Sequence, residues 1–195
     1  MTSLADALDS AWTLLVRGGA DRRSPMHTPV VSSIAANGLP DSRVMVLRKA
    51  ERVSACLRFH TDARSPKAQA LAGAPVSILA YDSGAAIQLR LSGSARVRTD
   101  GPDIDAIWHA STPFARRCYM VGNAPGSVLD APGSGLPADV EGRSPTAGEL
   151  LLARANFAVV MIAVTGIDWL HLAASGHRRA RFCAADGWQG CWLAP

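Results

Sequence analysis

The sequence predicts a mainly β fold in which an antiparallel sheet closes as a barrel and a few helices lie outside it. Two observations favour this class. Most apolar segments are short, and several alternate apolar with polar residues, as strands with one buried face do. The segments are joined by short turns, whereas parallel strands would need helical crossovers. With 195 residues, 48% of them hydrophobic, the chain suits one domain, so we expect residues 1–195 to form a single domain.

Helical spacing of apolar residues predicts an N-terminal helix within residues 1–20. Leu4, Leu8, Trp12 and Leu15 share one side of it, and we expect Gly18-Gly19 to end it. An aromatic residue on such a face usually belongs to the core. Further helices are expected at 65–72, 102–110, 113–119 and 146–155, the last with Thr146 and Glu149 at capping-box spacing.

The expected strands fill most of the remaining chain. They span 26–36, 42–49, 53–60, 76–81, 86–98, 157–164, 169–173, 178–184 and 188–193. We expect 42–49 and 53–60 to form a hairpin, Gly93 to mark a bulge or a bend, and Gly166 to lie in a turn. Residues 121–145 are rich in Gly and Pro, and so long a loop in a compact domain is often functional or mobile.

Composition excludes several classes of function. The net charge is +4, and no basic stripe interleaved with aromatics is present, so we expect no nucleic-acid partner. The four cysteines lack ligand-like spacing, which favours reduced, buried thiols and no metal site. The longest apolar stretch, 157–164, is far shorter than the ~20 residues that span a bilayer. Without a signal peptide at the start, we expect a cytoplasmic protein without a membrane partner.

A phosphate site is one interpretation of the region from Arg43 to Lys67. Two apolar runs with cations at their ends lead into Arg64-Ser65-Pro66-Lys67, which opens a helix. Arg43, Ser65 and Lys67 could converge there with the free N–H groups of the helix start. Solvated surface charges are the alternative for Arg43 and Lys67, and the spacing alone leaves both interpretations open.

Two other strands carry polar groups of interest. Gln88 is flanked by apolar residues, and its amide could bond the edge of a heteroaromatic ring or a neighbouring loop. In the segment 177–182, alternation puts Arg179 and Arg181 on one face, where they could hold an anion or guard a sheet edge.

The order of these motifs resembles the pyridoxamine 5'-phosphate oxidase-like family of FMN-binding split barrels. The segment 43–48 is similar to the family strand R-x-V-L-L-K, and His60-Thr61-Asp62 with Ser65-Pro66-Lys67 is similar to Y-T-N followed by S-R-K. Gln88-Leu89-Arg90 is similar to the family's Q-V-R strand. The resemblance implies an antiparallel, six-stranded split β-barrel of the FMN-binding type.

The resemblance also implies FMN as cofactor and a homodimer with the flavin at its interface. Arg43, Ser65 and Lys67 would hold the phosphate, and Gln88 would bond the ring edge. The residues that would line the ribityl chain and ring are Val44, Met45, Val46, Arg48, His60 and Thr61. Arg181 would come from the partner chain, and Asn123 and Gly126 are further candidates from the partner.

Departures from the family pattern bear on the activity. Pro66 replaces the arginine of S-R-K, and Arg48 replaces the lysine that helps the true oxidase to hold its substrate phosphate. The leading hypothesis is therefore an FMN-dependent oxidoreductase acting on an unknown small molecule. The alternatives are a non-catalytic split barrel that binds flavin, haem or a deazaflavin, and a true pyridoxamine 5'-phosphate oxidase. The sequence assigns no catalytic residue.

Overall fold

A computed structural model describes residues 3–195 of the chain. The helices are α1 (Leu4–Ala20), α2 (Pro66–Leu71), α3 (Pro102–Ala110) and α4 (Pro113–Arg116), with short 3₁₀ helices η1 (Pro25–His27), η2 (Arg117–Tyr119), η3 (Leu152–Asn156) and η4 (Ala184–Asp186). The strands are β1 (Val30–Ile34), β2 (Pro40–Val44), β3 (Leu47–Glu51), β4 (Cys56–Asp62), β5 (Pro75–Asp82), β6 (Ile87–Arg98), β7 (Phe157–His171), β8 (Arg178–Cys183) and β9 (Cys191–Leu193).

The chain divides into two compact units. The first contains the chain up to Phe59, Gly73–Arg96 and Met161–Pro195, and it holds most of the sheet together with α1. The second contains His60–Ala72 and Val97–Val160, which include α2, α3, α4 and the long loop. Within residues 3–195, no helix is both long and apolar enough to cross a bilayer.

The connectivity of the first unit closes its sheet. The hydrogen-bonded order is β2-β1-β5-β6-β7-β4-β3, so β2 and β3 lie at opposite ends of the path. Only Met45 and Val46 join these two strands. A chain advances at most about 3.6 Å per residue, so the end of β2 and the start of β3 lie within about 11 Å of each other. The sheet must therefore curl until these two strand ends come close, in agreement with the predicted antiparallel barrel.

The sheet has nine strands, and the expectation of six was wrong. Six was the number that the family resemblance implied. Among the strands predicted from the residues, 42–49 is two strands, and 157–164 and 169–173 are one. Met45 is buried, its backbone N–H donates to the carbonyl of Pro29 at 3.0 Å, and the chain leaves β2 there to begin β3. Residues 42–44 consequently pair with β1, and only the second part of the predicted strand forms a hairpin with β4.

The first strand begins later than expected. Residues 26–29 of the predicted strand are not extended, because Ser24 accepts a hydrogen bond from Met26 N–H at 3.3 Å and so starts η1. The strand β1 then runs from Val30 to Ile34.

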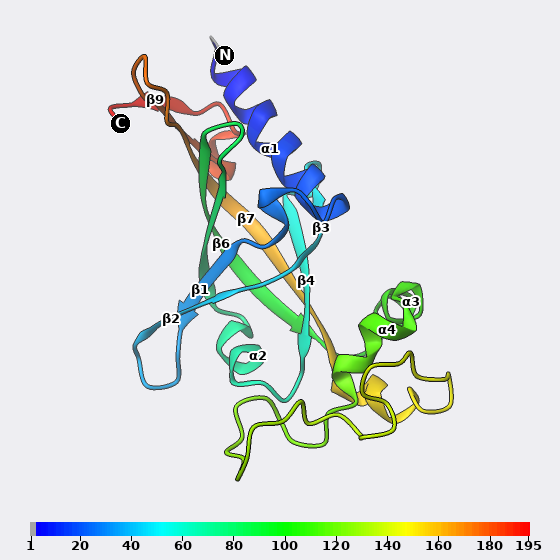
Figure 1. Ribbon diagram of the computed structural model, residues 1–195. Coiled ribbons are helices and arrows are strands. Elements are labelled where there is room, and N and C mark those ends of the chain that lie inside the picture. The colour runs from blue at the N-terminus through cyan, green and yellow to red at the C-terminus, as the bar shows by residue number, and fades with distance from the viewer. Residues whose placement is uncertain (1–2) are drawn as a thin grey trace. The chain divides into compact units, whose positions relative to one another are not determined.

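Gly18 and Gly19 do not end the first helix. The helix α1 continues to Ala20 and lies beside β3 (Figure 1). A Cβ atom on Gly18 would lie 2.8 Å from the backbone of Met26, and one on Gly19 would lie 3.1 Å from the Cα atom of Lys49. The two glycines therefore allow the helix to approach its neighbours closely, which their positions in the sequence alone did not indicate.

Gly166 and Gly93 also lie where atoms of another segment come close to the strand. The strand β7 runs unbroken through Gly166, so the predicted turn there was wrong. A Cβ atom on Gly166 would lie 2.6 Å from the hydroxyl oxygen of Ser92. The pairing of β5 with β6 stays in register through Gly93, so the residue causes no bulge in that pair.

The second unit has an aromatic core. The rings of Trp108, Tyr119 and Phe157 pack with centroids 5.1–5.8 Å apart, and His60 packs edge-on against Phe157 at 5.0 Å. The helix expected over 146–155 is a turn followed by η3, although the predicted pairing of Thr146 with Glu149 is present.

The four cysteines are free thiols, but three of them are not buried as expected. Cys118, Cys183 and Cys191 are exposed, and Cys56 is half-buried. Among residues 3–195, no group of His, Cys, Asp or Glu side chains gathers in a way that could hold a metal ion.

We expect Gly93→Ala to lower the free energy of unfolding by about 3 kcal/mol, at the upper end of typical overpacking costs. The added Cβ would clash with the backbone carbonyl oxygen of Ala163, and backbone cannot move aside as a side chain can. Urea denaturation monitored by circular dichroism measures the change. Gly133→Ala is the control, because nothing lies within 4 Å of its added methyl group. Equal stability of the two variants would contradict the close approach.

Candidate functional site

The predicted cofactor contacts fall into both compact units. The first unit holds Arg43 and Val44 in β2, Met45 and Val46 in the link, Arg48 in β3, Gln88 in β6 and Arg181 in β8. The second unit holds His60 and Thr61 at the end of β4, and Ser65 and Lys67 at the start of α2. The meeting of Arg43 with Ser65 and Lys67 around one phosphate stays a prediction.

Arg43 is held by its own strand pair. Its Nη1 donates to the carbonyl oxygen of Val31 at 3.1 Å and to the hydroxyl of Ser33 at 3.0 Å, while Nη2 pairs with the carboxylate of Asp41. The side chain is only 15% exposed. A phosphate bound by Arg43 would therefore share the guanidinium with Asp41.

Ser65 caps α2 with a buried hydroxyl. Its Oγ donates to the carbonyl oxygen of Asp62 at 2.7 Å and accepts from Ala68 N–H at 3.3 Å. The Thr61 hydroxyl lies 3.3 Å away, and Ser65 is 1% exposed. The serine that the sequence assigned to a phosphate therefore has a structural role in starting the helix.

Arg64 is a residue that the sequence interpretation did not single out. It binds Asp62 through two nitrogens, at 3.1 and 2.8 Å, and donates to the carbonyls of Val121 and Gly122 at 3.0 and 3.1 Å. The hydrogen bonds that Arg64 donates to the Asp62 carboxylate raise the pKa of Arg64, although burial opposes the shift. Arg64 thus ties the start of the long loop to the segment that precedes α2. No sequence pattern indicated this, because the acceptors are main-chain carbonyls 57 and 58 residues away.

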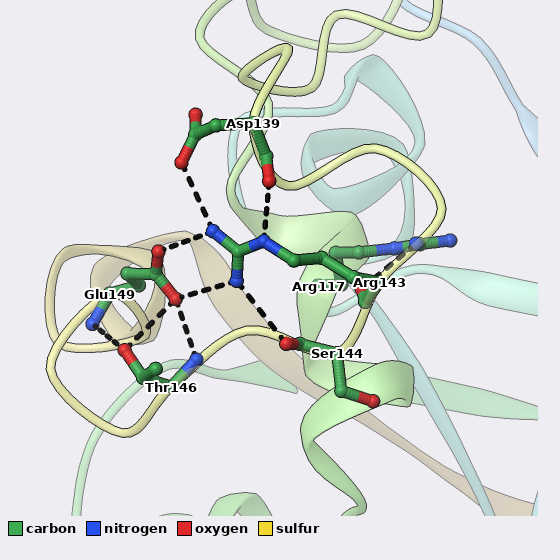
Figure 2. A network of polar contacts seen from close by, with 6 residues as sticks. All are labelled: Arg117, Asp139, Arg143, Ser144, Thr146 and Glu149. Carbon is green, nitrogen blue, oxygen red and sulfur yellow. Dashed lines mark hydrogen bonds and ion pairs between the residues drawn. The ribbon is translucent and has the colours of Figure 1, made fainter.

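The far end of the long loop is held by Arg143, as Figure 2 shows. The guanidinium binds Glu149 with both Nη atoms, at 3.1 and 2.6 Å, and Asp139 with Nη2 at 3.0 Å. Thr146 donates its backbone N–H to Glu149 at 2.6 Å, and Arg117 donates to the carbonyl of Arg143 at 3.1 Å. Arg143 and then Thr146 lower the pKa of Glu149 to about 2.

The start of α2 also contacts the long loop. A Cβ atom on Gly126 would lie 3.7 Å from the ring of Pro66, so the loop passes over the residue that replaces the family's arginine. Lys67 is half-buried, and it forms no ion pair with any residue between 3 and 195. Lys67 is therefore the cation of this segment that is available to a ligand.

A cavity of about 670 Å³ lies in the first unit, among β5 to β9. Its polar lining consists of Ser77, Arg90, Ser92, Thr165, Asp168, Arg181 and Asp186, with the thiols of Cys183 and Cys191. Ligand cavities of small molecules commonly measure about 300–1,000 Å³. Arg181 is thus the one predicted cofactor contact that lines this cavity.

Of the charged residues that line the cavity, Asp168 is paired with arginines and Arg181 is not. Asp168 accepts from Arg90 at 2.5 Å and from Arg179 at 2.8 Å. Burial by itself would raise the pKa of Asp168, but the hydrogen bonds from Arg179 and Arg90 outweigh it and lower that pKa. Arg181 lies opposite Asp168 in the β7–β8 pair, and it has no ion-pair partner within the described chain. Its charge is available to an anion.

Gln88 lies on the same face of β6 as Arg90, two residues away, and opposite Tyr81 of β5. The side chain is half-buried, and its amide makes no hydrogen bond to another residue of the segment 3–195. The structure therefore does not show the hydrogen bond to a neighbouring loop that was one of the two interpretations of Gln88.

Residues 9–99 match the family model described as "Pyridoxamine 5'-phosphate oxidase, FMN-binding domain". The predicted family resemblance is confirmed. A comparison with curated proteins gave no match.

Several solved structures share the fold of this chain. An FMN-binding protein related to pyridoxamine 5'-phosphate oxidase, from Nostoc punctiforme, is 20% identical, with a TM-score of 0.68 and coverage of 96% of each chain. PhzG from Burkholderia lata, in complex with tetrahydrophenazine-1-carboxylic acid, is 17% identical, with a TM-score of 0.66 and coverage of 98% of this chain and 90% of that one.

A third solved structure is more distant. A protein from Clostridium acetobutylicum related to general stress protein 26 is 11% identical, with a TM-score of 0.57 and coverage of 94% of this chain and 98% of that one. At these identities, the likeness shows the split-barrel fold alone.

We expect Ser65→Ala to lower the free energy of unfolding by about 1–2 kcal/mol, the usual cost of losing a helix cap. Thr112→Ala is the matched control, because Thr112 caps α4 through one hydrogen bond from Ala115 N–H at 3.2 Å and is exposed. Chemical denaturation should show a larger loss of unfolding free energy for Ser65→Ala than for Thr112→Ala, because the buried Ser65 hydroxyl also bonds Asp62. A Ser65→Ala protein of unchanged stability but weakened FMN binding would instead support a direct phosphate contact.

Glu149 should titrate near pH 2, below its ordinary value of 4.5. Because its folded pKa is depressed, its stabilising effect on the loop end is complete above pH 4.5 and is lost as the pH falls through about 2. Carboxyl NMR measures the midpoint, and exchange of the Thr146 amide should accelerate over the same range. In Arg143→Gln the midpoint should move back toward 4.5. A wild-type midpoint already near 4.5 would show that the Arg143 contacts do not persist in solution.

Proposed function

We propose that this protein binds FMN and acts as an FMN-dependent oxidoreductase on a small molecule. The observation that carries the proposal is the extent of the family match, residues 9–99. It includes the predicted cofactor contacts from Arg43 to Gln88, but neither Arg181 nor the further candidates Asn123 and Gly126. Bound FMN would supply the electron transfer, while the protein would position the ring and tune its potential.

The residues fit a flavin in several respects. Lys67 and Arg181 carry charges without ion-pair partners in the described chain, and Gln88 has an unused amide. The buried Nε of Arg48 has no hydrogen-bond partner within residues 3–195. In our proposal Lys67 and Arg43 hold the phosphate, Val44, Met45, Val46, Arg48, His60 and Thr61 line the ribityl chain and ring, and Gln88 bonds the ring edge.

The proposal includes a homodimer with the flavin between the two chains. Arg181 of one chain would then face the flavin held by the other, and a cation near the flavin's N1–C2=O edge favours the reduced, anionic form. The cavity around Arg181 is wide enough to admit part of such a ligand. We further propose a cytoplasmic location, with which the four free thiols agree.

A non-catalytic split barrel that binds flavin, haem or a deazaflavin is the second candidate. Two residues that the sequence assigned to the phosphate favour this candidate, since Arg43 is paired with Asp41 and the Ser65 hydroxyl bonds within the fold.

The absorbance of the purified protein separates the candidates. A flavin spectrum that bleaches on addition of a reducing substrate supports the oxidoreductase, whereas a Soret band or a colourless protein supports the second candidate. Pyridoxamine 5'-phosphate is the first substrate to test.

Lys67→Ala should weaken FMN binding by about 1–3 kcal/mol, the range for losing a charge-assisted hydrogen bond to the phosphate. Quenching of flavin fluorescence measures the affinity. Lys49→Ala is the matched control, because Lys49 is the other of the chain's two lysines and pairs with Glu51. Equal affinities of both variants and the wild-type protein would contradict the assigned phosphate contact.

A further inference from the structure

Two thiols and a cation share one wall of the cavity in the first unit. Arg181 lies directly opposite Cys191 in the β8–β9 pair, and Cys183 follows Arg181 by two residues on β8. Side chains two residues apart on a strand point to the same face, and opposite residues of an antiparallel pair have Cβ atoms about 5 Å apart. All three residues line the cavity of about 670 Å³. The strand register therefore places a thiol on each side of the guanidinium.

Solvent reaches both thiols of this wall. Cys183 and Cys191 are exposed, and neither is in a disulfide. The other two cysteines differ from them. Cys56 is half-buried, and burial raises the pKa of its thiol, while Cys118 lies in the second unit and donates its S–H to the carbonyl oxygen of Ala115 at 3.2 Å. Because an accessible thiol, once ionised, is the reactive nucleophile, the cavity pair is the better placed for thiol chemistry.

The charges around the cavity leave a positive excess. Asp168 binds two arginines, Arg90 at 2.5 Å and Arg179 at 2.8 Å. Asp186 also lines the cavity, from η4, and neither it nor Arg181 forms an ion pair within residues 3–195. Three arginines thus face two aspartates, and the excess attracts anions to the wall that carries Arg181.

The remaining polar lining suits a small molecule with carboxylate or amide groups. The hydroxyls of Ser77, Ser92 and Thr165 line the cavity, and each can donate and accept a hydrogen bond. The volume lies within the range of about 300–1,000 Å³ that small-molecule ligands occupy. The cavity therefore offers an anion site, neutral hydrogen-bonding groups and two nucleophiles to one ligand.

We propose that Arg181, Cys183 and Cys191 form a thiolation site for an anionic disulfide of low molecular weight. A thiolate of the pair attacks one sulfur of the bound disulfide, so that a new S–S bond joins that sulfur to the protein and the original S–S bond breaks. The other half leaves as a thiolate and takes up the proton that the protein thiol lost. The small disulfide is thus the oxidant, and the site needs no flavin, which takes it beyond the proposed function.

Two small disulfides of opposite charge test the site in the full-length chain. Oxidised glutathione is the anionic probe and cystamine the cationic one. Peptide mass spectrometry assigns each mixed disulfide to a cysteine and measures the rate at which it forms. We expect oxidised glutathione to react with Cys183 or Cys191 before it reacts with Cys118, although all three are exposed.

Substitution then measures the contribution of the cation. Arg181→Gln should slow the reaction of the cavity thiols with oxidised glutathione about fivefold, the effect of one unit charge at about 4 Å in water, and should not slow cystamine. Arg178→Gln is the matched control, because Arg178 is an exposed arginine of the same strand that does not line the cavity. It should react with both probes as the wild-type protein does.

Three results would overturn the site. They are a first glutathione adduct on Cys118, an unchanged glutathione rate in Arg181→Gln, and an equal slowing of both probes in that variant. The last would mean that Arg181 supports the fold of the wall and does not attract the anion.

A parallel FMN titration separates failure of this site from failure of the proposed function, which also uses Arg181. A chain that forms the selective glutathione adduct but binds no FMN would overturn the proposed function and support the thiolation site. A chain that binds FMN but, in its flavin-free form, shows no charge-selective adduct would overturn the thiolation site alone.

Discussion

The two-residue link of Met45 and Val46 is the constraint on which the rest of the first unit depends. It joins strands from opposite ends of the hydrogen-bonded path, so the sheet cannot stay open. The same link carries predicted flavin contacts, with Arg43 just before it and Arg48 just after it. Closure of the barrel and placement of the candidate ligand contacts therefore depend on one segment. Its buried member, Met45, holds the segment through packing and through a hydrogen bond to Pro29.

Charge pairing divides the arginines of this chain into two kinds. Arg64, Arg143 and Arg179 bind carboxylates and main-chain carbonyls, and they fasten loops and strands. Arg181, in contrast, lines the cavity and has no ion-pair partner among residues 3–195. Because desolvated charge is costly unless it is matched, the unmatched cations are the positions where a ligand would contribute most. The proposed flavin contact of Arg181 follows from this distinction.

The long loop shows how a segment without helices or strands is held in place. Residues 121–145 lack the apolar periodicity that would give them a face to bury. Arg64 fixes one end through main-chain carbonyls, and Arg143 fixes the other through Asp139 and Glu149. Planar guanidinium groups suit this task, because their several donors reach acceptors on different turns of the chain at once. Its contact at Pro66 brings the loop to the start of α2, beside Lys67.

The sequence by itself determined the class of fold and most strands and helices, because period-two and helical apolar patterns are local properties. It also identified the Thr146–Glu149 pair. Only the tertiary structure decided that Gly18 and Gly166 serve close approaches, that the Ser65 hydroxyl points inward, and that Arg48 sits on a bulge. Each of these depends on which distant backbone lies opposite, and a local pattern contains no information about that neighbour.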